Sequence, residues 1–221
     1  MQKIINKLKF FFLILFVFLG GCETAKFDYS AFKASKPSSI LVLPPLNESV
    51  DVNATSAVYA SLVNPLSESG YYVFPPTLVM ETFKQNGLTE PRRIHDLSLS
   101  KLNEVFGADA ILYINIKKYG QTYSIITSAN VVSLEAYLVD TKTETEIWRG
   151  QAAASSNENS SNNNMGLAGL LITAVVEQVA GQIFDSGFPT SQIANKRLLS
   201  ASVPNSLLYG PRHEKAGTNG Q

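Results

Sequence analysis

The sequence predicts an α+β fold: a single domain with a mixed β-sheet and helices packed mainly on one face. In the first half of the chain, an apolar run, a stretch with helical periodicity and a second apolar run follow one another, the order of a parallel βαβ unit. In the second half, apolar and polar residues alternate along successive stretches, which is typical of an antiparallel meander. A length of 221 residues allows one domain with a sizeable core.

The parallel unit begins with residues 39–43 (SILVL), an apolar run that ends at two prolines and predicts a buried strand. A helix follows, because apolar residues recur at every fourth position, namely Val58, Leu62 and Leu66. Pro65 removes an internal hydrogen bond, so we expect this helix to end or kink near Asn64. Residues 71–74 form the second strand, parallel to the first.

Two further helices are predicted before the meander. One opens at residues 75–77 (PPT) and ends at Gly87. The other starts at Ser98 or Ser100 and ends at Gly107, since glycine readily adopts the left-handed conformation that closes a helix. These helices would cover the sheet.

The meander consists of three alternating stretches. Residues 110–117 form the first strand, and Gly120 marks its turn. A long strand over 131–138 follows, turns at 140–143 and returns over 146–152.

The chain then becomes polar. Residues 155–164 contain only Ser, Asn and one Glu, which predicts a flexible loop. Residues 165–184 are apolar but interrupted by polar side chains, which favours a packed helix over a membrane span. Its small residues would let another backbone approach, so a homodimer could form through this helix or through an exposed sheet edge.

The amino-terminal segment has the pattern of a secretory signal. Three lysines precede an uncharged run over residues 10–18, and Leu19-Gly20-Gly21-Cys22 closes the segment. The run of about nine residues is shorter than the roughly 20 that a membrane-spanning helix needs. The closing tetrad resembles the bacterial lipobox, which implies cleavage before Cys22 and diacylglyceryl and fatty acyl (palmitate) groups on Cys22. A plain signal peptide with a chance cysteine is the alternative.

These features divide the chain into four parts. They are a signal peptide at 1–21, a lipidated Cys22 with a tether at 22–38, the lipoprotein domain at 39–213 and a flexible tail at 214–221. Cys22 is the only cysteine, so no intramolecular disulfide can form and the fold must depend on its apolar core. Glu23 after the cysteine favours the outer membrane, with the domain facing the periplasm.

Charge and motifs exclude several functions. Without the signal the chain has 15 basic and 18 acidic residues. The resulting net charge of −3 provides no excess of positive charge for binding nucleic acid. His95 and His213 are far apart and are expected on the surface, and no His/Cys cluster offers metal-ligand spacing. No nucleophile elbow or phosphate loop is present, so we expect no cofactor. A Ser/His/Asp triad is recognised by its geometry, so the sequence alone does not exclude one.

Two stretches are candidate contact surfaces. Residues 44–49 (PPLNES) follow the first strand, at the edge where open parallel sheets tend to bind ligands. Their simpler interpretation is an ordinary connecting loop. Residues 207–213 (LLYGPRH) are apolar and close to the carboxyl terminus. They either dock on the domain, which we favour, or meet a partner.

Several motifs together resemble a family of bacterial lipoproteins that includes a surface lipoprotein studied as a vaccine antigen. They are the lipobox, SILVLPPLNES, LSESGYYVFPP, FGADAILYI, LVDTKTETEIWRG and LLYGPRH. The resemblance implies a fold like the amino-terminal domain of TolB. It also implies a gene neighbourhood with a CsgG-like protein and a second small lipoprotein. No active site is known for the family, so only Cys22 carries over as a modified residue.

The sequence therefore predicts a non-enzymatic outer-membrane lipoprotein that serves an envelope assembly or secretion complex with CsgG-like and small lipoprotein partners. One alternative is an activator of a peptidoglycan synthase. A tether of about 16 residues averages only about 20–25 Å as a coil, which argues against long reach. The other alternative is an envelope hydrolase, which requires a pocket with converging polar groups.

Overall fold

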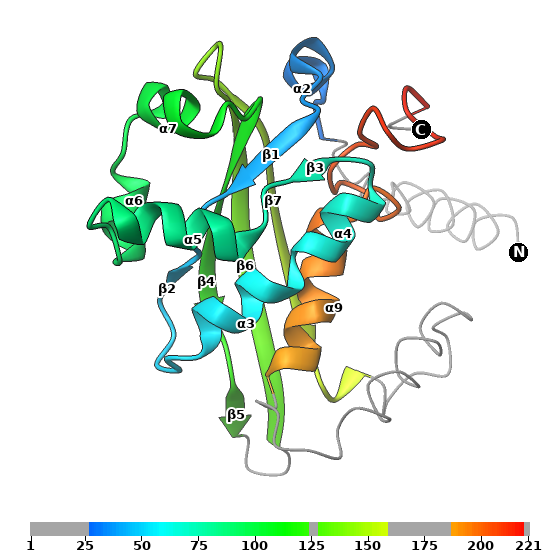
Figure 1. Ribbon diagram of the computed structural model, residues 1–221. Helices are drawn as coiled ribbons and strands as arrows, with labels where there is room; N and C mark the ends of the chain where they lie inside the picture. The colour runs from blue at the N-terminus through cyan, green and yellow to red at the C-terminus, as the bar shows by residue number, and fades with distance from the viewer. Residues whose placement is uncertain (1–26, 124–127, 159–186, 219–221) are drawn as a thin grey trace, which may run out of the picture.

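A computed structural model describes residues 27–123, 128–158 and 187–218, which form one domain around a seven-stranded mixed sheet (Figure 1). The predicted signal peptide, Cys22 and the helix expected at 165–184 lie outside the described residues. So does most of the loop expected at 155–164.

The parallel half of the sheet has the predicted βαβ arrangement. Strand β1 (Ser39–Val42) pairs in parallel with β3 (Tyr72–Val73) on one side and with β4 (Ala110–Lys118) on the other. Between β1 and β3 lie α3 (Ala54–Ser61) and α4 (Val63–Glu68). The break falls at Leu62, because Pro65 has no N–H to donate to the carbonyl of Ser61. The predicted kink is therefore confirmed, two residues before the expected position.

The helices α5 (Pro76–Gln85) and α7 (Leu99–Phe106) form where the sequence predicts them. The Ser98 hydroxyl accepts a hydrogen bond from the backbone N–H of Lys101, and Gly107 closes α7 with a φ of 64°. A five-residue helix between them, α6 (Pro91–His95), was not predicted. Little more than one turn is too short to show a helical repeat.

The antiparallel half is the predicted meander. Strand β4 pairs with the long β6 (Ser128–Asp140), which also pairs with β5 (Gln121–Tyr123) and β7 (Glu146–Ser155). A register shift after Leu138 makes a β-bulge in β7. As a result the adjacent residues Ile147 and Trp148 both enter the same core cluster.

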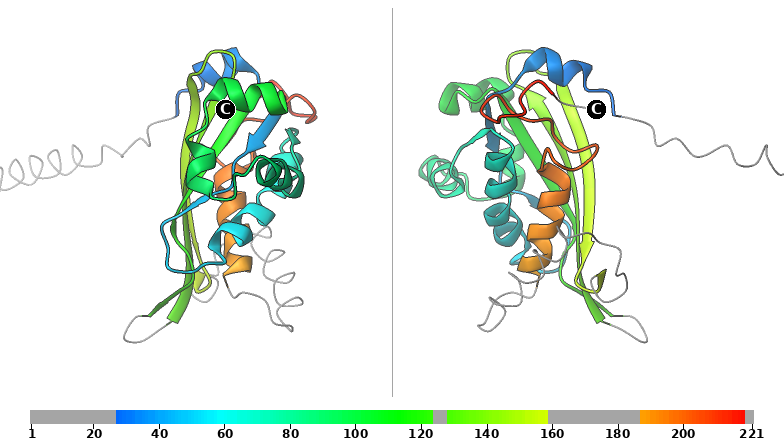
Figure 2. Two further views of the ribbon diagram at one scale, coloured as in Figure 1. Left: turned by 60° about the vertical axis from the view of Figure 1, so that its left-hand side comes forward. Right: turned by 90° about the vertical axis from the view of Figure 1, so that its right-hand side faces the viewer.

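The sheet has two unequal apolar layers. On one face, alternate residues of β1, β4, β6 and β7 pack against α3, α4 and α9 (Phe188–Leu199). On the other face, Leu41, Ile111 and Tyr113 pack against α5, α6 and α7. That second layer covers β1 and part of β4, while the outer face of β7 exposes Arg149 and Gln151. Figure 2 shows the long strands edge-on, with α3 and α9 on one side of them. The predicted α+β single domain with a mixed sheet is confirmed. Helices pack on both faces rather than mainly on one, and the larger core cluster lies on the face covered by α3, α4 and α9.

The segment expected as a tether belongs to the domain from residue 27 onward. Residues 30–35 form α2 (Ser30–Ser35), and Phe32, which is 4% exposed, lies in the main core cluster. The Tyr29 hydroxyl donates to the carbonyl of Ser206, and the Ser35 hydroxyl donates to Asp140. The tether prediction is wrong for residues 27–38, because aromatic side chains spaced within this polar stretch bury themselves against the sheet.

Candidate functional site

The single predicted site residue, Cys22, lies outside the described residues. Within them, four sites are candidates: the two surfaces that the sequence indicates, and two clefts that sequence reasoning missed.

The first surface, residues 44–49, is more ordered than an ordinary loop, and its hydrogen bonds continue to residue 53. It contains β2 (Leu46–Asn47), which pairs in parallel with β4 beyond the end of β1. The Glu48 carboxylate accepts hydrogen bonds from the Lys117 ammonium and from the Asn115 amide, both at 2.6 Å. These two bonds, that from Lys117 first, hold the pKa of Glu48 below its usual range. The start of the surface is therefore fixed to the sheet.

Hydrogen bonds also fix the rest of this surface. The Asn47 amide donates to the carbonyl of Asp51 at 2.8 Å, and the Asp51 carboxylate accepts from the N–H of Asn53 at 2.9 Å. This arrangement holds Val50 at 100% exposure and Val52 at 88% exposure. An ordered loop that presents two neighbouring apolar side chains to solvent is a candidate contact surface.

His95 lies behind this surface. Its Nε2 is 2.9 Å from the carbonyl oxygen of Pro44, and its ring packs edge-on against Tyr113. Burial lowers the pKa of His95, against the raising effect of the hydrogen bond to Pro44, so the neutral ring is favoured. The surface position expected for His95 is wrong: the ring is half-buried and supports the end of β1.

The second surface, residues 207–213, docks on the domain as favoured. Leu207 and Leu208 are buried in the main core cluster, and the Tyr71 hydroxyl donates to the carbonyl of Leu208. The backbone N–H of Gly210 donates to the carbonyl of Ser69 at 2.7 Å.

Gly210 is the closest point of this contact. A Cβ at Gly210 would lie 2.6 Å from the carbonyl oxygen of Gly70, a separation that forces the backbone apart.

We expect Gly210→Ala to destabilise the domain by about 1–3 kcal/mol, because crowding a packed contact strains it. Urea unfolding measures the loss, and limited proteolysis should show cleavage near residue 210. Ala216→Ser, at an exposed position of the same segment, should change neither. Equal stability of the two variants would contradict a tight docking contact.

Next to this contact is a cleft of about 370 Å³ between α2 and the carboxyl-terminal segment. Phe32, Tyr71 and Leu208 give it buried apolar walls, and the exposed Lys33 and Lys36 lie at its rim. We refer to it as the α2 cleft.

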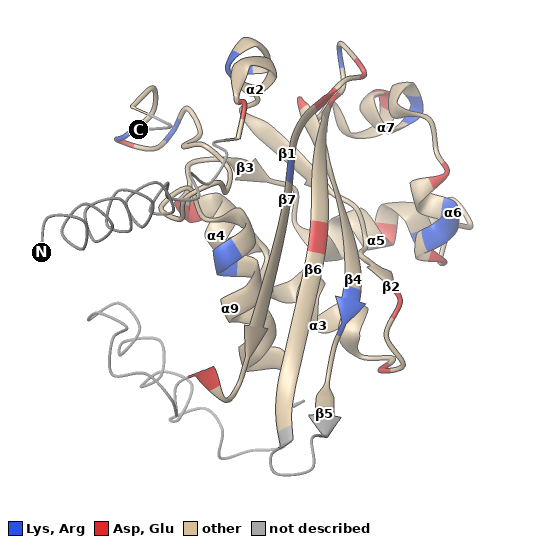
Figure 3. Cartoon of the chain, turned by 180° about the vertical axis from the view of Figure 1, so that it is seen from behind, with Lys and Arg blue, Asp and Glu red and all other residues tan. Residues whose placement is uncertain are grey.

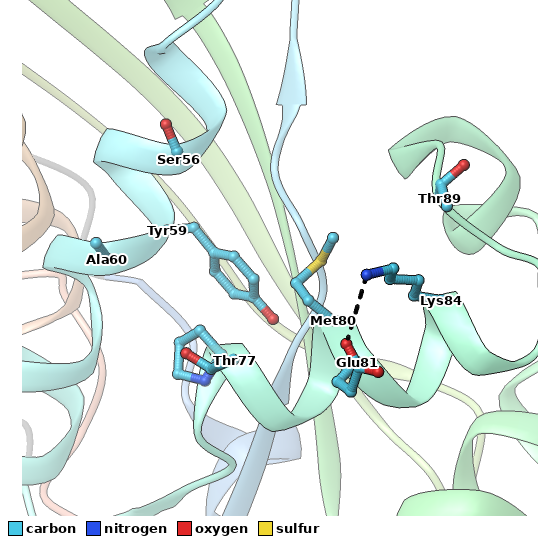
Figure 4. A pocket seen from close by; sticks show the side chains of 9 residues that line it. Ser56, Tyr59, Ala60, Thr77, Met80, Glu81, Lys84 and Thr89 are labelled. Atoms are coloured by element: carbon cyan, nitrogen blue, oxygen red, sulfur yellow. Dashed lines mark ion pairs between the residues drawn. The ribbon is translucent and has the colours of Figure 1, made fainter.

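The second cleft missed by sequence reasoning has a volume of about 400 Å³ and lies between α3 and α5 (Figure 4). Tyr59 and Met80 line it, and Glu81 and Lys84 form an ion pair of 4.0 Å at its edge. The Tyr59 hydroxyl donates to the carbonyl of Val42, and burial raises the pKa of Tyr59, so this phenol stays protonated. The cleft forms only because α3 and α5, which are separated in the sequence, pack against each other.

Among the hydroxyl-bearing side chains that line the α3–α5 cleft, that of Ser56 donates to the carbonyl of Asn53 at 2.9 Å. In the part of the chain that the structure describes, no group of three or more His, Cys, Asp or Glu residues could hold a metal ion. Among those residues there is also no helix long and apolar enough to cross a membrane.

The fold defines the class of this protein: a single-domain α+β protein built on a mixed sheet. The chain belongs to the family described as "Putative lipoprotein GNA1162-like", whose model matches residues 27–212. The lipoprotein NMB1124/NMB1162 of Neisseria meningitidis serogroup B is 51% identical over 197 residues, which cover 88% of this chain and 91% of that protein. The family membership expected from the motifs is therefore confirmed.

One solved structure supports this assignment. The crystal structure of lipoprotein GNA1162 from Neisseria meningitidis is 51% identical, with a TM-score of 0.54, and the match covers 66% of this chain and 100% of that one. TolB from Acinetobacter baumannii matches at 12% identity and a TM-score of 0.32, over 65% of this chain and 28% of TolB. That score is too low to support the expected relation to TolB.

Proposed function

We propose that this lipoprotein is a non-enzymatic accessory component of an envelope assembly or secretion complex. In this proposal acyl groups on Cys22 anchor it in the outer membrane, and the domain faces the periplasm and binds a CsgG-like partner. The observation that carries the proposal is the ordered loop that exposes Val50 and Val52. Family membership supports the lipoprotein part, and the motif resemblance suggests the partner.

The position of the loop suits this role. Figure 1 shows α2 at one end of the domain and the loop between β2 and α3 toward the other end, where β5 lies. Because a chain anchored at Cys22 reaches the domain at Phe27, the α2 end would be the one closest to the bilayer. The exposed valines would then point away from the lipid and toward a protein.

The reach of the anchor argues against the peptidoglycan-synthase alternative. Only four residues separate Cys22 from Phe27, which packs against the core, so the anchor allows at most about 18 Å. That is shorter than the sequence-based expectation, because residues 27–38 of the expected tether belong to the domain. A domain held so close to its membrane is suited to partners in the same membrane.

The clefts give the hydrolase alternative little support. A serine hydrolase needs a hydroxyl that donates to a base. Ser56 in the α3–α5 cleft donates to a backbone carbonyl instead, and the only carboxylate lining that cleft, Glu81, pairs with Lys84. Purified protein that released product from peptidoglycan or from ester substrates would overturn the non-enzymatic part of the proposal.

The homodimer stays a proposal as well. Its expected helix at 165–184 lies outside the described residues. Strand β7 forms one edge of the sheet, and there the Arg197 guanidinium donates to the carbonyl of Ala153 at 2.7 Å. That bond occupies a carbonyl which a second copy would otherwise use, so pairing through β7 is limited at this point.

Substituting the exposed valines tests the partner surface. We expect the double variant Val50→Asp/Val52→Asp to reduce recovery of the CsgG-like protein from solubilised envelopes by at least about tenfold, since buried apolar anchors dominate interfaces. Both side chains are solvated in the free domain, so the unfolding midpoint should not change.

The matched control is Val105→Asp, a valine that is 49% exposed on α7. It should leave recovery unchanged. If the wild-type chain recovers no CsgG-like protein, the choice of partner is wrong. If the double variant still recovers the CsgG-like protein in full, Val50 and Val52 do not form the partner surface.

A further inference from the structure

The α2 cleft lies at the end of the domain where the chain from Cys22 arrives. Figures 1 and 2 show α2 and the carboxyl-terminal segment side by side at this end, with β5 at the opposite end. The arriving chain is fixed there, because the Phe27 ring packs 4.8 Å from the Tyr29 ring and the Tyr29 hydroxyl bonds to Ser206.

The cleft is amphipathic. Phe32 and Leu208 give apolar walls that are themselves nearly inaccessible to solvent, at 4% and 6% exposure. The side chains of Lys33 and Lys36 line the rim and are exposed. Among the ion pairs within the described residues, none includes either lysine. Two exposed lysines thus line the same cleft as the apolar side chains of Phe32 and Leu208.

The two segments that border the α2 cleft contain more basic than acidic residues. Residues 27–38 and 207–218 together contain four basic residues and two acidic ones, whereas the chain after the signal has a net charge of −3. Figure 3 shows Lys and Arg on both α2 and the carboxyl-terminal segment. The segments that border the cleft therefore carry a small excess of positive charge. Asp109 and Asp140 lie beside α2 and accept hydrogen bonds from the hydroxyls of Ser38 and Ser35.

We propose that the α2 cleft binds an anionic phospholipid of the leaflet that holds the anchor. Lys33 and Lys36 bind the phosphate of the headgroup, and the apolar walls formed by Phe32 and Leu208 receive the start of an acyl chain. The inference rests on the proposed anchor at Cys22, because a reach of at most about 18 Å is what brings this end to the bilayer. Each lysine near an anionic surface contributes a favourable electrostatic interaction.

The direct test uses the lipidated protein in vesicles of phosphatidylethanolamine with one-quarter phosphatidylglycerol, and in vesicles of phosphatidylcholine alone. An amine-reactive reagent labels accessible lysines, and mass spectrometry quantifies each site. We expect labelling of Lys33 and Lys36 to fall at least about threefold in the anionic vesicles relative to the neutral ones. Lys118, exposed near β5, should be labelled equally in both. Equal labelling of Lys33 and Lys36 in both would overturn the proposal.

A second experiment removes the acyl groups on Cys22, so that lipid binding by the cleft is tested separately from the anchor. The chain from residue 22 carrying Cys22→Ser should float with phosphatidylglycerol vesicles at low salt, and Lys33→Glu/Lys36→Glu should weaken this binding by about tenfold or more. Lys118→Glu/Lys196→Glu makes the same charge change at exposed positions elsewhere and should weaken it much less. Equal losses in both double variants, or no binding by the parent chain, would contradict the lipid site. A missing acyl group on Cys22 would contradict only the anchor.

Discussion

Replacing Leu112 with alanine is expected to destabilise the domain by about 2–5 kcal/mol, which approaches the whole stability of a small domain. Leu112 is the third residue of β4, lies opposite Val42 on one side and Leu138 on the other, and has no exposed surface. Both halves of the sheet meet at this side chain. Its truncation leaves a cavity that the parallel and antiparallel halves cannot both close.

The single tryptophan, Trp148, provides the readout for this variant. It is 1% exposed and pairs with Leu138 across β6 and β7, so its fluorescence reports solvent entering the core. Leu78→Ala on α5 is the control, because Leu78 is 63% exposed and its truncation should change stability by less than about 0.5 kcal/mol. Similar urea midpoints for the two variants would show that β4 is not the centre of the core.

The elements that sequence reasoning predicted correctly are those whose signal is local. The strands β1 and β3 are short apolar runs ended by prolines, and α7 has both a serine cap and a closing glycine. The meander follows from alternation of apolar and polar residues, which the structure shows most clearly along β6, where Val132, Leu134, Ala136 and Leu138 are buried.

The elements that were missed depend on tertiary contacts. The helix α2 has six residues in a polar stretch, and only the burial of Phe32 against the sheet makes it part of the domain. The strand β2 has two residues and exists because β4 continues beyond β1. No periodicity can be detected in segments this short.

The candidate surfaces also depend in part on tertiary contacts, which the sequence does not reveal. The sequence indicated residues 44–49 and 207–213, and the structure gives each a definite arrangement. It did not indicate Val50 and Val52, whose exposure follows from the hydrogen bonds made by Asn47 and Asp51. Both clefts lie between segments distant in the chain, so only the folded structure reveals them.

Replacing Cys22 with serine is expected to move the protein almost entirely from the membrane fraction to the soluble fraction. A single acyl chain gives only marginal membrane binding and several give stable anchoring, so loss of all of them removes the attachment. The α2 cleft alone would add only weak, salt-sensitive binding. Fractionation in high salt, followed by immunoblotting, measures the change.

Ser30→Ala is the control for this variant, since Ser30 is exposed on α2 and close to the anchor. It should stay in the membrane fraction. Retention of the Cys22→Ser protein in washed membranes would show that another attachment, such as an uncleaved leader, holds the chain.

The mass of the mature amino-terminal peptide tests the anchor most directly. After digestion of protein extracted from membranes, the account predicts a peptide that begins at Cys22 and carries a diacylglyceryl group on the sulfur and an acyl group on the amine. A peptide with a bare thiol at Cys22, or one that still contains residues 1–21, would contradict it.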